Sequence, residues 1–289
     1  NAITGVTAAY MDSVPMIIIS GQVSTLFSKK KMSIRQLGFQ EFDIISSIKS
    51  TTKYAININN KNKVQYELEK ACYIAKNGRP GPVWLDIPLD VQNSFIELKK
   101  SRSFIFKNKK KILKPKTNSI DLVIKNFKKS KRPLVVMGHG VYLSGGKYEA
   151  RKLIMNLKVP CQTTWNSIDL IPEKNKFYFG RANSYGPRYS NFIIQNADYI
   201  ISIGARLGVQ HTGYNVKTFA RNAILHMVDI DKNESKKPGL KVDKFFKCDA
   251  KEFIIKLKKI FNKNKINNKH NEWINYCMDL KKKYPVSPQ

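Results

Sequence analysis

Short apolar runs alternate with amphipathic segments along this sequence, and that alternation constrains its fold more than any other feature. Residues 16–20 read MIIIS and residues 81–88 read GPVWLDIP, both typical of buried strands. Between them, residues 64–78 carry apolar side chains at helical spacing and end at Gly78. Strands and helices that alternate at this spacing predict an α/β fold with a parallel sheet.

A second block with the same alternation follows a charged stretch. Its apolar runs tend to end in Gly or Asp and a turn, as in 132–140, 191–206 and 224–231. Amphipathic segments lie at 147–158 and 250–261. This pattern predicts a Rossmann-like, doubly wound parallel sheet, in which a ligand crevice lies at the carboxyl ends of the strands.

The 289 residues are enough for about two domains at roughly 100 to 200 residues each. The sequence loses its periodicity and becomes charged near residue 97, which predicts a connection between domains. We therefore expect a first domain at 1–96, a linker at 97–117 and a central domain at 118–262. Residues 263–289 are expected to form a helical tail that runs into a further linker.

Lys and Arg number 52 against 21 acidic residues, a net charge of +31. Such an excess can indicate a nucleic-acid partner. Here the lysines are spread along the chain without interleaved aromatic residues, so we interpret them as a compositional bias on solvated faces and expect no nucleic-acid partner. The apolar content of 42% argues against wholesale disorder, and no apolar run is long enough to predict a membrane span.

Cysteine and histidine spacing gives no sign of a metal site within the chain. The four cysteines lie far apart without a CxxC motif, so a reduced, cytoplasmic protein is expected. His226 lies inside an apolar run and is interpreted as a core residue. Glu41 and Asp43 precede another apolar run, and acids in the first turn of a helix explain them without catalysis.

Three expected strand ends in the second block carry small or acidic residues. Gly138 and Gly140 follow the first, Gly204 follows the second and Asp229 ends the third. Glycine lets a backbone approach a phosphate closely, and an acid at a strand end often accepts hydrogen bonds from a ribose. A nucleotide-like ligand is therefore one interpretation, and a packed α/β domain without a ligand is the other.

Longer segments resemble a known family. Residues 1–25, 39–54 (FQEFDIISSIKSTTKY) and 77–92 (NGRPGPVWLDIPLDVQ) are similar in register to thiamine-diphosphate-dependent enzymes. FQE narrows the resemblance to the large subunit of acetolactate synthase, also called acetohydroxyacid synthase. GHG, GARLGVQHTG, VDID and CDA extend it through the second block.

The resemblance implies the C-terminal part of a pyrimidine-binding domain followed by the central domain. It further implies a transferase (carboligase) of branched-chain amino acid biosynthesis, which decarboxylates a 2-oxoacid such as pyruvate and ligates the two-carbon unit to a second carbonyl compound. Thiamine diphosphate and Mg²⁺ would be held mainly by segments outside this chain, so the chain alone is expected to be inactive. The active site would lie between subunits of a homodimer or homotetramer.

Residue roles also follow from the resemblance. Ser13 and Gln40 would lie close to thiamine diphosphate, while Phe39 and Lys53 would line the entrance for the 2-oxoacid. Arg79 would reach a flavin dinucleotide (FAD), because its fork of donors suits a pyrophosphate. The remaining flavin-binding residues would be Gly138, Gly140, Thr164, Trp165, Gly204, Arg206, Asp229, Ile230 and Asp249.

The sequence departs from the family pattern at two places. The family's glycine triplet is GHG here, and its GARFDDR run reads GARLGVQ, so Gln210 replaces an Arg that holds the acceptor's carboxylate. These departures leave open whether the pocket holds FAD, an adenine nucleotide or no ligand, and which acceptor is used. A simple 2-oxoacid decarboxylase, an acyl-CoA-processing relative and a non-catalytic nucleotide-binding module are the alternatives.

Overall fold

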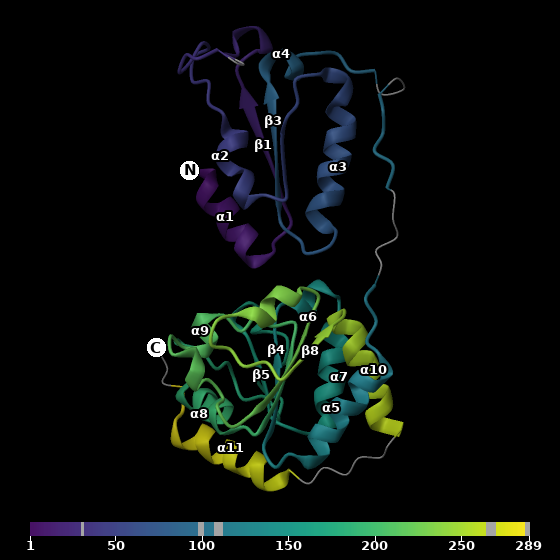
Figure 1. Cartoon of the computed structure of the whole chain (residues 1–289), viewed down its shortest axis with the longest axis vertical. Coiled ribbons are helices and arrows are strands. Elements are labelled where there is room, and N and C mark those ends of the chain that lie inside the picture. Colours follow the sequence, from purple (N-terminus) through teal and green to yellow (C-terminus); the bar gives the residue numbers. More distant parts are fainter. Residues whose placement is uncertain (30–31, 98–100, 107–111, 264–269, 287–289) are drawn as a thin grey trace. The chain divides into compact units, whose positions relative to one another are not determined.

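The chain folds into two compact units, residues 1–111 and 112–289. The computed structural model describes residues 1–29, 32–97, 101–106, 112–263 and 270–286 (Figure 1). Each unit has its own parallel sheet with helices on both faces, which confirms the predicted α/β class.

Unit 1 is built around a parallel sheet in the order β1-β3-β2. Its strands are β1 (Met16–Gln22), β2 (Tyr54–Asn57) and β3 (Pro82–Pro88). Its α-helices are α1 (Ala2–Asp12), α2 (Ile44–Ile48), α3 (Val64–Lys76) and α4 (Leu89–Gln92). Short 3-10 helices are η1 (Thr25–Phe27), η2 (Lys49–Thr51) and η3 (Lys61–Lys63).

The central strand β3 supplies side chains to both faces of this sheet. Val83 and Leu85 pack in a cluster with Ala71 and Ala75 of α3. Trp84, which lies between them in the sequence, packs on the other face with the α1 and α2 side. Successive side chains of a strand point to opposite faces, so the continuous apolar run in β3 is what a strand covered on both sides requires.

Unit 2 has parallel strands in the order β5-β4-β6-β7-β8. The strands are β4 (Pro133–Met137), β5 (Cys161–Thr163), β6 (Tyr199–Ile203), β7 (Ile224–Asp229) and β8 (Lys244–Lys247). The chain runs first into the centre of the sheet, then outward to β5, and then crosses to the opposite side of β4. This is a doubly wound order, as predicted, and its topological switch point lies between β4 and β6.

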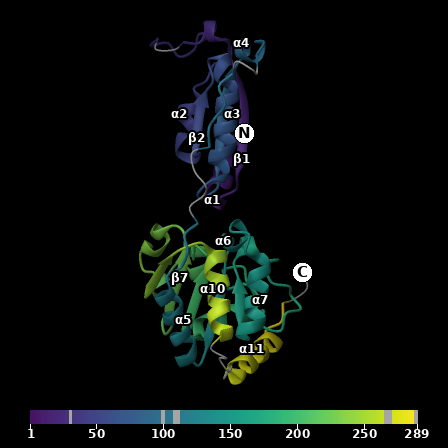
Figure 2. The same ribbon diagram turned by 90° about the vertical axis from the view of Figure 1, so that its right-hand side faces the viewer.

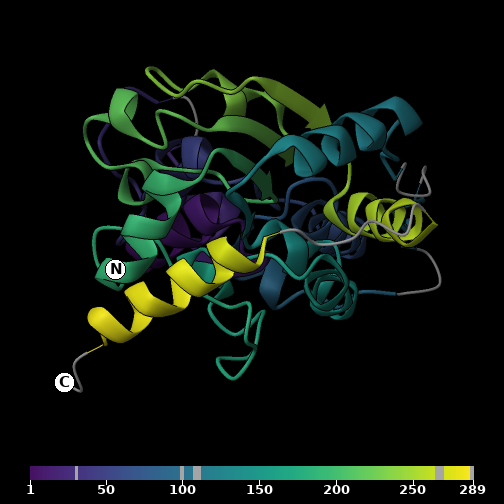
Figure 3. The same ribbon diagram turned by 90° about the horizontal axis from the view of Figure 1, so that it is seen from below.

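Helices cover both faces of this sheet. The longer ones are α5 (Thr117–Lys129), α7 (Lys147–Leu157), α8 (Arg188–Asn196), α10 (Ala250–Lys263) and α11 (Asn271–Lys283). Helices α5, α7 and α10 lie side by side on one face (Figure 2), and α8 and α11 pack together on the other (Figure 3). The shorter helices are α6 (Gly140–Leu143), α9 (Val209–Thr212), η5 (Trp165–Ser167), η6 (Val216–Thr218) and η7 (Lys232–Lys236).

Two segments expected outside the domains pack onto the units. In residues 101–106, the Phe104 ring lies 5.4 Å from Tyr66 of α3, and the Phe104 N–H donates to the Glu69 carboxylate at 2.6 Å. Within residues 263–289, α11 buries Trp273, whose indole N–H donates to the Pro133 carbonyl at 2.9 Å. The domain boundaries stay predictions, and the break between the two compact units lies after Lys111. No helix in the described part of the chain has the length and apolar character to cross a membrane.

The anchoring of α11 is testable by mutation. Trp273→Ala removes a buried indole and leaves the Pro133 carbonyl without this donor, so the free energy of unfolding should fall by about 3–5 kcal/mol. Asn275→Ala, on the exposed side of the same helix, should change it by less than about 0.5 kcal/mol. Urea unfolding followed by circular dichroism measures both values. Equal effects would show that α11 is not fixed to the sheet as described.

Candidate functional site

The carboxyl ends of β4 and β6 approach each other closely at the switch point. A Cβ atom on Gly138 would lie 2.2 Å from the Gly204 carbonyl oxygen, and one on Gly140 would lie 2.8 Å from the Gly204 Cα. Gly204 also has a φ of +60°, which glycine adopts readily. The Gly140 N–H donates to the Gly204 carbonyl at 2.9 Å. The packing of the two strand ends therefore requires these glycines even without a ligand.

A cavity of about 390 Å³ in unit 2 is lined by Trp165, Asn183, Tyr185 and Gln210. Trp165 follows β5, and Gln210 lies in α9 after β6. The Trp165 and Tyr185 rings stand 6.5 Å apart at an interplanar angle of 66°, and their exposed fractions are 58% and 77%. Asn183 is buried and accepts the Tyr185 N–H at 2.7 Å, which fixes this wall of the cavity.

Two buried polar atoms in the segments that carry the lining residues lack partners within the described residues. The Arg181 guanidinium lies 5.4 Å from the centre of the Trp165 ring, a cation–π contact, yet its buried Nε has no hydrogen-bond acceptor there. The buried Nε2 of His211, which follows Gln210, also has no partner among them. Burial lowers the pKa of His211 to about 4, so its ring is neutral at pH 7. The cavity itself combines the two aromatic rings with the carboxamides of Asn183 and Gln210, a lining that suits a planar ligand with hydrogen-bonding atoms.

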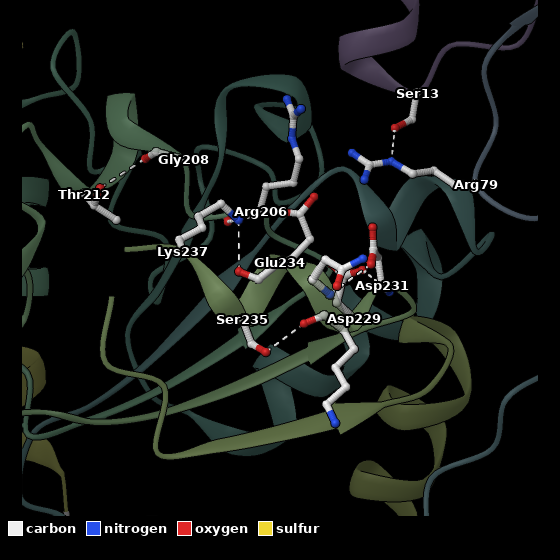
Figure 4. A network of polar contacts seen from close by, with 12 residues as sticks. Ser13, Arg79, Arg206, Gly208, Thr212, Asp229, Asp231, Glu234, Ser235 and Lys237 are labelled. Carbon is white, nitrogen blue, oxygen red and sulfur yellow. Dashed lines mark hydrogen bonds and ion pairs between the residues drawn. The ribbon is translucent and has the colours of Figure 1, made fainter. Parts of the chain in front are cut away.

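At the carboxyl ends of β6 and β7, a polar network joins the turn after β7 to the loop after β6 (Figure 4). The Asp231 N–H donates to the Asp229 carboxylate at 3.0 Å. The Lys237 ammonium donates to the Arg206 carbonyl at 2.6 Å and to the Glu234 carbonyl at 3.0 Å. Lys237 therefore holds the backbone of Arg206 in place. Sequence reasoning did not single out Lys237, because a lysine among so many carries no distinctive signal.

Other residues assigned to the flavin by resemblance have local structural roles. The Asp249 carboxylate accepts the N–H groups of Lys251 and Glu252 at 2.9 and 3.2 Å, and so caps α10. Thr164 forms a capping box with Ser167 at the start of η5. Ile230 follows β7 and is 39% exposed. A capping role does not exclude ligand binding, so these assignments stay predictions.

In unit 1, Arg79 and Ser13 are brought together. The Arg79 Nε–H donates to the Ser13 hydroxyl at 2.8 Å (Figure 4). Ser13 ends α1 in the left-handed region, with a φ of +59°. The turn before β3 is thereby tied to the end of α1, and both residues keep their proposed cofactor roles as predictions.

Two residues assigned to the substrate entrance, Lys53 and Phe39, have different surroundings in unit 1, and Gln40, assigned to thiamine diphosphate, lies beside Phe39. The Lys53 ammonium donates to the carbonyls of Ile74 and Asn77 at the end of α3, and burial lowers its pKa. Phe39 is 87% exposed, and Gln40 beside it has a φ of +60°. Phe39 therefore lies outside the core of unit 1, whereas Lys53 has a structural role at a helix end.

Two interpretations of charged or titratable residues can be compared with the structure. His226 is a core residue, as expected, since its Nδ1 lies 3.0 Å from the Tyr199 hydroxyl and burial lowers its pKa to about 4. Asp43 caps α2 by accepting the Ser46 N–H. The expectation for Glu41 is wrong: its carboxylate accepts backbone N–H groups of the preceding loop, not of the helix.

Comparison with known proteins identifies the second unit. Residues 120–257 match the model of the thiamine pyrophosphate enzyme central domain. This part of unit 2 is therefore a thiamine pyrophosphate enzyme central domain. The recognition made from the sequence motifs is thus confirmed.

Similarity extends beyond that domain to nearly the whole chain. The acetolactate synthase large subunit of Cyanidium caldarium is 32% identical, with 99% of this chain and 49% of the relative covered. A probable acetolactate synthase large subunit of Methanococcus aeolicus is 33% identical over 100% of this chain and 50% of the relative. The acetolactate synthase large subunit of Lactococcus lactis is 29% identical, with 99% of this chain and 48% of the relative covered. The chain thus spans about half the length of these relatives.

The requirement for glycine at the switch point can be tested directly. Gly138→Ala places a Cβ against the Gly204 carbonyl and should lower the free energy of unfolding by about 1–3 kcal/mol. Gly208→Ala is a matched control, because its Cβ would meet nothing within 4 Å and its φ of −72° suits alanine. Thermal unfolding of both variants measures the difference. An undisturbed Gly138→Ala variant would argue against the close packing of β4 and β6.

Proposed function

We propose that this chain is part of an acetolactate synthase-like enzyme that decarboxylates a 2-oxoacid such as pyruvate and ligates the two-carbon unit to a second carbonyl compound. The observation that carries this proposal is similarity to acetolactate synthase large subunits over at least 99% of the chain. Thiamine diphosphate, when bound, supplies the electron sink for decarboxylation. The protein contributes orientation and a pocket that excludes water.

Within this proposal, unit 1 supplies Phe39 and Gln40 to the substrate side of the active site. The exposed apolar ring of Phe39 can cover the reacting carbon and exclude water. The Gln40 carboxamide can both donate and accept a hydrogen bond at the substrate's oxygen atoms. Among the described residues no group of His, Cys, Asp and Glu could hold a metal ion. We assign Mg²⁺ to other segments of the complete enzyme, which we propose to be a homodimer or homotetramer.

Unit 2 has a cavity whose walls fit the ring system of a flavin. Trp165 and Tyr185 offer aromatic faces, and Asn183 and Gln210 offer carboxamide groups. Its volume of about 390 Å³ suits one ring system but not a whole dinucleotide. We therefore propose that the remainder of FAD, if bound, extends along the strand ends near Arg206 and Asp229.

The acceptor is proposed to differ from that of the relatives. Gln210 lines the cavity with a neutral carboxamide. A carboxamide makes a hydrogen bond to a carbonyl oxygen, whereas a guanidinium pairs bidentately with a carboxylate. A neutral carbonyl compound, such as an aldehyde, therefore suits this position better than a second 2-oxoacid does.

Product analysis of the complete enzyme tests the reaction and its acceptor. With pyruvate and an aldehyde, the wild type should form the mixed ligation product in preference to acetolactate. Gln210→Arg should raise kcat/KM for a 2-oxoacid acceptor by roughly 10- to 100-fold, because a charged hydrogen bond contributes about 1.5–3 kcal/mol. Gln210→Glu keeps the size of the side chain but gives it a negative charge, which repels a carboxylate. This variant should lower kcat/KM for the 2-oxoacid acceptor. Release of acetaldehyde alone would instead identify a simple decarboxylase.

Flavin binding is tested separately by absorption spectroscopy. The purified complete enzyme should show flavin bands, and Trp165→Ala should lower its flavin content severalfold, because the aromatic wall of the cavity is removed. Tyr214→Ala is the control, since Tyr214 is 94% exposed and does not line the cavity. A colourless protein that gains no flavin on reconstitution would remove FAD from the proposal and leave the thiamine chemistry standing.

A further inference from the structure

In the loop between β1 and α2, the described residues 23–29 and 32–43 have few apolar contacts that could fix its shape. Its large apolar side chains are mostly exposed, including those of Leu26, Phe27, Leu37, Phe39 and Phe42. Apolar burial therefore contributes little to holding the backbone of Phe39 and Gln40 in one conformation. Polar contacts must supply that constraint.

Glu41, directly after Gln40, provides the first of these contacts. One carboxylate oxygen accepts the Lys29 N–H at 2.6 Å and the Ser28 hydroxyl at 3.2 Å. The other oxygen accepts the Leu37 N–H at 2.9 Å. One side chain thus joins the beginning and the end of the loop. Burial acts to raise the pKa of Glu41, but these donors outweigh it and lower the pKa, so the carboxylate is ionised at pH 7.

Gln22 and Asp86 anchor the other side of the same segment. Asp86 is buried at the carboxyl end of β3 and accepts hydrogen bonds from Ser20, Asn57 and Gln22 at 2.6, 2.9 and 3.1 Å. The Gln22 amide also donates to the Phe42 carbonyl at 2.8 Å. The residue after Glu41 is therefore connected through Gln22 to a buried carboxylate in the sheet.

The backbone between these anchors is strained. Gln40 has a φ of +60°, a left-handed conformation that is unfavourable for a non-glycine residue. A Cβ on Gly38 would lie 2.9 Å from the Phe27 carbonyl oxygen, so this turn has no room for a larger residue. A strained conformation persists only where its surroundings over-determine it, and the contacts of Glu41 and Gln22 do so here.

We propose that Glu41 is a positioning residue for Phe39 and Gln40, holding them in the one backbone conformation that presents both side chains to the substrate. Gln22 supports it by fixing Phe42 to the sheet. This inference rests on the proposed function, because it assumes that Phe39 and Gln40 contact the substrate. Glu41 itself acts through the backbone and not on the reacting atoms.

The test uses the complete enzyme and four variants. Glu41→Ala should lower kcat/KM for the 2-oxoacid by roughly 10- to 100-fold, the effect of a displacement of about 1 Å at a reacting group. Glu41→Gln, which keeps one acceptor oxygen, should restore part of the loss. The double variant Phe39→Ala/Gln40→Ala should also lose activity, and adding Glu41→Ala to it should cause no further loss, because the residues that Glu41 positions are absent.

A matched control separates positioning from general loosening of unit 1. The Glu69 carboxylate also holds a loop, accepting the Ser103 hydroxyl and the Phe104 N–H at 2.6 Å each. Glu69→Ala should therefore leave kcat/KM within about twofold of the wild type. In Glu41→Ala, hydrogen exchange at the Lys29 and Leu37 amides should accelerate while the melting temperature stays close to the wild-type value.

The outcomes distinguish failure of the inference from failure of the proposed function. If Phe39→Ala/Gln40→Ala keeps full activity, the proposed roles of those two residues are wrong, and the positioning role is overturned with them. If that variant loses activity but Glu41→Ala does not, only the positioning role is overturned. If the loss from Glu41→Ala is undiminished in the Phe39→Ala/Gln40→Ala background, Glu41 acts by another route and the inference is also overturned.

Discussion

The close approach of β4 and β6 at their carboxyl ends determines the architecture of unit 2. Gly138 and Gly140 face Gly204 at distances that leave no room for a side chain. Because the chain winds outward in opposite directions from β4, the loops after β5 and β6 leave the sheet on either side of this contact. Trp165 and Gln210 come from those two loops and meet at one cavity. The cavity is thus a consequence of strand order and of two unusually close backbones.

The same contact changes how the glycine motif should be interpreted. Strand-end glycines are often taken as evidence that a backbone approaches a phosphate. Here the partner of each glycine is another segment of the chain, so the motif is satisfied without any ligand. A ligand would therefore be recognised by the aromatic rings of the cavity and by the carboxamides of Asn183 and Gln210. None of these features is part of the glycine pattern.

The strands of unit 2 could be predicted from the sequence, because the pattern of apolar residues depends directly on which side chains are buried. Strands β4 and β6 are buried along their whole length, and their continuous apolar runs predicted this. Sequence reasoning failed for contacts between segments distant in sequence. The charged residues 97–117 gave no sign that Phe104 packs on α3. Arg181 and Tyr185 lie in a stretch without periodicity, and only folding brings them to Trp165.

Glu41 belongs to a motif that correctly predicted the start of a helix, but its own role is different from the predicted one. Two acids before an apolar run suggest a helix start, and Asp43 indeed caps α2. Glu41 lies two residues earlier and turns back to the loop, because the strained backbone at Gln40 directs its carboxylate towards Lys29 and Leu37. Local sequence preference cannot reveal such a reversal, since it depends on a positive φ at a residue that seldom adopts one. Strain, carboxylate and exposed aromatic ring thus occur within three consecutive residues, and strain that is held in place in this way is typical of functional sites.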